Sequence, residues 1–131
     1  MAFDDLDNDG DIDVVVVNSR ERPTILRSMY CEQGGRNHWL DLRLQGATTN
    51  RDGVGARVRV TAGDLVQIDE VHSGRGYQSH WGSRLHFGLG SHDRVQRIEV
   101  QWIGGGTEVL EDVAVDRLLT IQEGGGGGGT R

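Results

Sequence analysis

The sequence contains no lysine, one proline, one cysteine and few aromatic residues. The single cysteine, Cys31, excludes an internal disulfide framework and a CxxC metal site. The longest uninterrupted apolar run is the four valines from Val14 to Val17, which is too short to span a bilayer. All fourteen basic residues are arginine and they form no basic block, so we do not expect nucleic acid as a partner.

Negative charge is in excess, and it is concentrated at one end of the chain. The formal net charge is -6, and the first thirteen residues contain six aspartates and no basic residue. The remaining 118 residues carry 14 acidic and 14 basic residues and are formally neutral. The excess is therefore one local feature and not a general acidic surface. The six aspartates are Asp4, Asp5, Asp7, Asp9, Asp11 and Asp13.

The remainder of the chain is dominated by alternation of apolar and polar residues, which is typical of strands with one face in a core. The clearest apolar positions are Leu40, Leu42 and Leu44; Ala56, Val58 and Val60; and Ile98, Val100 and Trp102. Val66 and Ile68 begin a similar pattern, which Asp69-Glu70-Val71 interrupts, and this indicates a bulge or a strand end. Shorter strand candidates are 12–18, 24–29, 85–88, 108–110 and 118–122, and a single helical turn is the best helical candidate, near 112–116.

Many short strands separated by glycine-rich turns predict an all-β fold, either a β-sandwich or a barrel-like domain. The composition divides the chain into residues 1–31, a polar linker at 32–37, a β domain at 38–123 and a glycine-rich tail at 124–131 that we expect to be disordered. Two strands cannot bury enough surface to fold alone. Residues 1–31 must therefore dock on the rest of the chain or belong to a larger domain.

The acidic segment from Asp5 to Asp13 has the spacing D-x-D-x-D-G-x-x-D. Carboxylates at the first, third and fifth positions of a tight loop point to one centre, and glycine at the sixth position, Gly10, permits the bend. The seventh position usually contributes a backbone carbonyl and the ninth a further carboxylate. The predicted ligands of a Ca2+ ion are Asp5, Asp7, Asp9, Asp11 (through its carbonyl) and Asp13.

The loop is not an EF-hand, because its twelfth position is Val16 and no helices flank it. Two like charges about 4 Å apart repel by roughly 1 kcal/mol in water and by up to about 4 kcal/mol near a protein surface. Converging carboxylates must therefore open the loop or raise some of their pKa values unless a cation neutralises them. The alternative is a solvated acidic terminus whose spacing is accidental.

Residues 5–16 resemble the calcium loop of FG-GAP or VCBS repeats, the blade units of integrin-like β-propellers. The remainder resembles the ASPIC/UnbV domain that follows such repeats in cartilage acidic protein and its bacterial relatives. The matching stretches are 50–58, 74–79, 84–90 and 116–121. The resemblance implies an extracellular or periplasmic protein of interaction character, with calcium bound by the five aspartates named above.

A propeller needs at least four blades of four strands, and this chain holds part of one. The chain therefore resembles the C-terminal end of a longer protein, whose signal peptide and upstream propeller we expect to lie outside it. Met1 to Asp5 lacks the basic and apolar regions of a secretory signal. The predicted partners are a protein or a glycan, together with the rest of the propeller.

Two further interpretations remain open. Trp39, Tyr77 and Trp81 form a candidate ligand-binding set, which would make the chain a carbohydrate-binding module. We favour the alternative that they cover a sheet edge or a propeller. An accessory or catalytic role in a pathway would require His72, His80 or His86 beside a carboxylate in a pocket. Because the five histidines show no metal-binding spacing and the serines no nucleophile elbow, we expect a non-enzymatic protein. The histidines are His38, His72, His80, His86 and His92.

Overall fold

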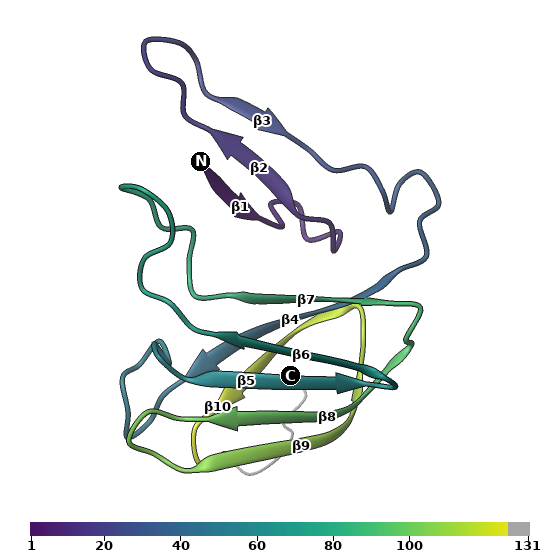
Figure 1. Cartoon of the computed structure of the whole chain (residues 1–131), viewed down its shortest axis with the longest axis vertical. Coiled ribbons are helices and arrows are strands. Elements are labelled where there is room, and N and C mark those ends of the chain that lie inside the picture. The colour runs from purple at the N-terminus through teal and green to yellow at the C-terminus, as the bar shows by residue number, and fades with distance from the viewer. Residues whose placement is uncertain (126–131) are drawn as a thin grey trace. The chain divides into compact units, whose positions relative to one another are not determined.

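The computed structural model describes residues 1–125, and all regular structure in that range is β-strand. Ten strands form three sheets and no closed barrel among these residues, which confirms the all-β class. The chain separates into two compact units, which Figure 1 shows: Met1–Arg36 with Ser73–Gly82, and Asn37–His72 with Ser83 onward. The described residues contain no helix with the length and apolarity needed to cross a bilayer. Most of the predicted tail, 124–131, lies outside the described residues.

The first unit contains an antiparallel sheet of three short strands, in the order β1-β2-β3. These are β1 (Ala2–Asp4), which the sequence did not predict, β2 (Asp13–Val16) and β3 (Thr24–Leu26). The segment Ser73–Gly82 belongs to this unit although it follows β6 in the chain. The rings of Phe3 and Trp81 pack in a T-shaped arrangement, with ring centroids 5.7 Å apart and planes at 74°. An aromatic contact therefore joins this segment to β1.

The second unit contains two sheets. One has the order β10-β4-β7, with β4 (His38–Gln45) parallel to β10 (Arg117–Gln122) and antiparallel to β7 (Leu85–Gly90). The other is antiparallel throughout, in the order β6-β5-β8-β9. Its strands are β5 (Arg57–Ala62), β6 (Leu65–Glu70), β8 (Arg94–Gln101) and β9 (Thr107–Ala114). In Figure 1, β4 and β10 pass behind β5 and β8, so the two sheets form the layers of a sandwich.

The core lies between these two layers and follows the predicted alternation. The side chains of Leu40, Leu42 and Leu44 from one sheet are buried in the same cluster as those of β5 and β8 from the other. Phe87 is the largest fully buried side chain. The strands with clean period-two patterns therefore supply the core. The predicted core residues on or directly beside β5 and β8 that are buried are Ala56, Val58, Val60, Ile98, Val100 and Trp102.

The strand end predicted at Asp69-Glu70-Val71 is confirmed, because β6 ends at Glu70, whereas two other expectations about this unit are wrong. Val66 and Ile68 do lie on a strand, but they are 46% and 59% exposed because their register with Thr61 and Arg59 puts them on the outer face. No helical turn forms near 112–116, because β9 continues to Ala114 and the residues up to Arg117 make a tight connection. Asp112 and Asp116 adopt positive φ values of 59° and 58° there.

The loop that follows β4 is fixed by one buried carboxylate. Glu123 accepts backbone hydrogen bonds from Ala47, Thr48 and Thr49, at 2.8 to 2.9 Å, and hydroxyl hydrogen bonds from both threonines. Donation by the Thr49 N–H and these other groups, against an opposing effect of desolvation, lowers the pKa of Glu123 to about 2. Hydrogen bonding to the charged form therefore ties the end of β10 to the loop that precedes β5.

Candidate functional site

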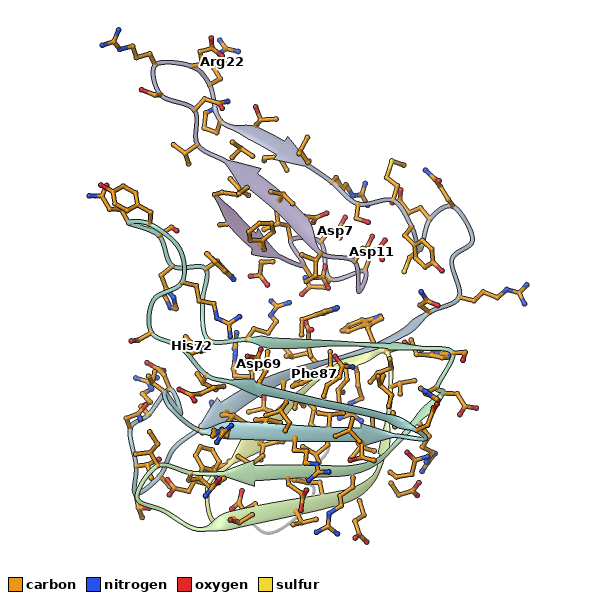
Figure 2. All side chains as sticks on the ribbon, in the orientation of Figure 1. Asp7, Asp11, Arg22, Asp69, His72 and Phe87 are labelled. Atoms are coloured by element: carbon orange, nitrogen blue, oxygen red, sulfur yellow. The ribbon has the colours of Figure 1, made fainter. Side chains whose placement is uncertain are left out.

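The acidic loop connects β1 to β2, and two residues bend it in the left-handed backbone region. Asn8 has φ 60° and Gly10 has φ 94°, which glycine adopts without steric cost. The N–H groups of Asp9 and Gly10 donate to the carboxylate of Asp5 at 3.1 and 3.0 Å. The bend predicted at the sixth position of the motif is thus present, and it wraps the loop around Asp5. Figure 2 shows Asp7 and Asp11 in this loop.

Three of the five predicted ligands come together. Asp5, Asp7 and Asp13 each place one carboxylate oxygen within 4.8 Å of the other two. Asp5 and Asp13 are each only 2% exposed, whereas Asp7 is exposed. Asp13, the first residue of β2, accepts hydrogen bonds from the N–H groups of Leu6 at 3.2 Å and Ser28 at 2.8 Å. The backbone therefore holds two buried carboxylates beside a third.

Asp9, the fifth position of the motif, has one carboxylate oxygen that accepts a hydrogen bond and one that does not. Its Oδ1 accepts a hydrogen bond from the Asp11 N–H at 2.9 Å, while Oδ2 is buried and has no hydrogen-bond partner among the described residues. The hydrogen bond from Asp11 lowers the pKa of Asp9, but burial and the charges of Asp7, Asp11 and Asp5 outweigh it and raise that pKa. The pKa of Asp9 is thus raised, as the crowding of carboxylates in this loop predicts, and burial contributes to the same shift.

Asp11 directs its carboxylate away from this set. Its Oδ2 accepts a hydrogen bond from the Cys31 N–H at 2.9 Å, and its Oδ1 accepts one from the Cys31 Sγ at 3.3 Å. Burial raises the pKa of Asp11, but these and neighbouring hydrogen bonds outweigh burial and lower the pKa overall. The side chain therefore ties the loop to the segment after β3, and only its backbone carbonyl remains as the predicted ligand.

Arg27 is a residue of this site that the sequence did not reveal. Its Nε lies 2.5 Å from Asp7 Oδ2, and its Nη2 lies 3.9 Å from Asp9 Oδ2 and 2.5 Å from Glu32 Oε1. Because Arg27 and Asp7 are far apart in sequence and match no motif, nothing in the pattern pairs them. The guanidinium balances part of the loop's charge from its exposed side.

The donor set fits a hard cation. Carboxylate and carbonyl oxygens are the ligands that Ca2+ prefers, and Ca2+ accepts irregular sets of six to eight of them. The buried Asp9 Oδ2, with its raised pKa, lies in the same loop as the three converged carboxylates. The only thiol, that of Cys31, donates to Asp11 and lies outside this group. The chemistry of these residues is therefore compatible with a hard divalent cation such as Ca2+.

The three aromatic residues predicted to bind a ligand differ in their surroundings. Tyr77 is 89% exposed. Trp81 is half-buried against Phe3 in the first unit, and Trp39, in the second unit, stacks on His86 with ring centroids 6.3 Å apart. Only Tyr77 therefore presents a fully exposed ring.

The histidines lie beside carboxylates more often than their spacing suggested. His86 Nδ1 lies 2.7 Å from Asp41 Oδ1, and His38 Nδ1 lies 2.7 Å from Asp116 Oδ2. Asp41 also accepts a hydrogen bond from Arg84 Nη1 at 3.1 Å. Among the described residues, no hydroxyl or thiol group hydrogen bonds to His86, so the pair lacks the nucleophile of a triad.

Comparison with known proteins concerns mainly the second unit. The family model described as ASPIC and UnbV matches residues 46–128, which is more than half of the chain. No curated protein matches the sequence. The matched residues include β5 to β10 and thus most of the sandwich, whereas the acidic loop lies outside them. The chain belongs to the ASPIC and UnbV family.

Proposed function

We propose that this chain is a calcium-binding, non-enzymatic interaction module of a protein that acts outside the cytoplasm. The observation that carries the proposal is the convergence of Asp5, Asp7 and Asp13 to within 4.8 Å, two of them 2% exposed, in a loop with the D-x-D-x-D-G-x-x-D spacing. The proposed ligands are these three, the Asp9 carboxylate and the Asp11 carbonyl.

Electrostatics explain why this arrangement favours a divalent cation. At about 4 Å, each pair of carboxylates costs up to about 4 kcal/mol at the dielectric of a protein surface. Arg27 offsets part of this repulsion at Asp7 and Asp9, but its side chain is 48% exposed, so solvent screens its charge. A bound Ca2+ supplies two positive charges and lets the carboxylates stay converged. Against the hydrogen bond from the Asp11 N–H, burial together with the charges of Asp7, Asp11 and Asp5 raises the pKa of Asp9, and the charge contribution supports repulsion within this loop.

The compartment and the interaction role form the second part of the proposal. Extracellular calcium modules bind the ion at about 10⁻⁴ to 10⁻³ M, which suits a site whose loop also carries an arginine counter-charge. The resemblance of residues 5–16 to FG-GAP or VCBS repeats agrees with this setting. The proposed partners are a protein or a glycan, with an upstream propeller as the neighbour of the first unit.

Calorimetric titration of Ca2+ into the full chain tests the metal site. We expect one saturable site, and we expect Asp9→Asn to weaken it by about tenfold or more because it removes one of few charged ligands. Asp64→Asn is the matched control, because Asp64 is 97% exposed and lies in the turn between β5 and β6. Equal isotherms for the two variants, or no saturation in the millimolar range, would overturn the proposal.

A further inference from the structure

The outer face of the four-stranded sheet carries a cleft of about 390 Å³. This volume lies in the range of roughly 300–1,000 Å³ that is common for small-ligand sites. The cleft lies entirely in the second unit and shares no residue with the acidic loop. The side chains that matter for its chemistry are Arg57, Arg59, Ile68, Glu99, Gln101 and Thr107.

Strand register explains why these residues share one face. Arg57 lies opposite Gln101 on β8, which in turn lies opposite Thr107 on β9. Arg59 lies between Ile68 on β6 and Glu99 on β8. These two rows are separated by two residues along each strand, roughly 6.6 Å, and Val58 between them faces the core. The cleft is thus a groove between two adjacent rows of outward side chains.

The arginines in the groove differ in whether they form an ion pair. Glu99 lies between two arginines, with Oε1 3.1 Å from Arg97 Nη2 and Oε2 3.9 Å from Arg59 Nε. Arg57 forms no ion pair among the described residues, and none joins it to Glu70, its cross-strand neighbour on β6. Arg57 is therefore the arginine of the groove that has no direct ion pair in the described part of the chain, and an amide and a hydroxyl lie beside it in its own row.

We propose that this groove binds an acidic oligosaccharide that carries uronate carboxylates. The planar guanidinium of Arg57 matches a carboxylate with two parallel hydrogen bonds. Gln101 and Thr107 can each donate to and accept from sugar hydroxyls. Ile68, which is 59% exposed, offers an apolar surface to the C–H face of a sugar ring.

The carboxylate of Glu99 favours a uronate over other anions. A carboxylate in the groove repels a compact polyanion such as phosphate, but it accepts hydrogen bonds from hydroxyl groups. A uronate unit presents one anionic group beside several hydroxyls, so it can satisfy Arg57 and Glu99 together. An acidic peptide offers the carboxylate without the neighbouring hydroxyls.

The test is a titration of the full chain with an oligogalacturonate, compared with its methyl ester, which keeps the hydroxyls and removes the charge. We expect the acid to bind and the ester to bind at least about tenfold more weakly, because a charge-assisted pair is lost. Arg57→Gln should weaken binding of the acid by a similar factor. Arg43→Gln is the control, since Arg43 is an exposed strand arginine on the other sheet, and it should change nothing.

Amide chemical shifts measured in the same titration should move on β5, β8 and β9. Gln101→Ala provides a second variant that keeps every charge, and it should also weaken binding. The proposal is overturned by absence of binding at millimolar oligosaccharide, by equal affinity for acid and ester, or by equal losses in Arg57→Gln and Arg43→Gln. Equal binding of a poly-aspartate peptide would overturn the assignment to a sugar.

Discussion

Asp41 is the buried charge whose removal the structure allows us to predict in most detail. It is 1% exposed, on the side of β4 opposite to the core leucines, and it accepts hydrogen bonds from Arg84 and His86. Arg84 and His86 are 19% and 23% exposed, so both can reach water if Asp41 changes. Loss of a partner therefore leaves the Asp41 carboxylate buried away from water, whereas Arg84 and His86 can be hydrated.

The expected costs follow from that difference. At 3.1 Å and an effective dielectric constant of about 20, the attraction between Asp41 and Arg84 is about 5 kcal/mol before desolvation is subtracted. Arg84→Met leaves a buried carboxylate without its charged partner and should cost about 3 kcal/mol. Asp41→Asn keeps the shape and leaves partners that can hydrate, so about 1–2 kcal/mol is expected. Arg84→Met in the Asp41→Asn background should cost about 1 kcal/mol.

Urea unfolding of the four proteins, followed by circular dichroism, measures this cycle. A loss of about 3 kcal/mol moves the midpoint by roughly 1–3 M, well above experimental error. The coupling energy between the two positions should be about 2 kcal/mol. Additive effects within about 0.5 kcal/mol, or a larger loss for Asp41→Asn than for Arg84→Met, would contradict a stabilising coupling between Asp41 and Arg84.

Three shorter predictions concern other parts of the chain. The folded pKa of Glu123 is about 2 against an ordinary 4.5, so its stabilisation is present above about pH 4.5 and disappears as pH falls towards 2. Urea unfolding should show Glu123→Gln less stable than the wild type at pH 6, with the difference shrinking at pH 3, and a constant difference would contradict this. Gly53→Ala should cost about 1–2 kcal/mol in the same assay, because φ is +65° and the new Cβ would lie 2.8 Å from Leu44 Cβ; Gly106→Ala, with open space and no positive φ, is the control. Phe3→Ala should speed amide hydrogen exchange in residues 73–82 by removing the contact with Trp81, and unchanged exchange there would show that this contact does not hold the segment.

Much of the sandwich could be predicted from the sequence because its strands alternate cleanly. Leu40, Leu42 and Leu44 are all buried, as the alternation predicts. Alternate residues of a strand lie on the same face, so the three leucines share one apolar face. Val66 and Ile68 follow the same alternation and face outward. The pattern identifies two faces, but the pairing with β5 decides which of them meets the core.

The candidate site shows the same limit at the level of single side chains. The spacing of the aspartates predicts the bend at Gly10 and the convergence of Asp5, Asp7 and Asp13, because those depend on local backbone geometry. Arg27 could not be predicted, because its approach to Asp7 depends on how β3 pairs with β2. The groove on the outer face of the four-stranded sheet could not be predicted either, because it depends on the register of β5, β6, β8 and β9 together.

A Ca2+ titration of the full chain, followed by residue-resolved amide chemical shifts, tests the proposed calcium site most directly. We expect saturable shifts that are centred on Asp5 to Asp13 and extend to Ser28 and Cys31, whose N–H groups donate to Asp13 and Asp11. Mg2+ at the same concentration should produce weaker shifts, because it demands closer octahedral geometry. Small, non-saturating shifts spread over exposed carboxylates such as Asp64 and Asp112 would contradict a calcium site in this loop.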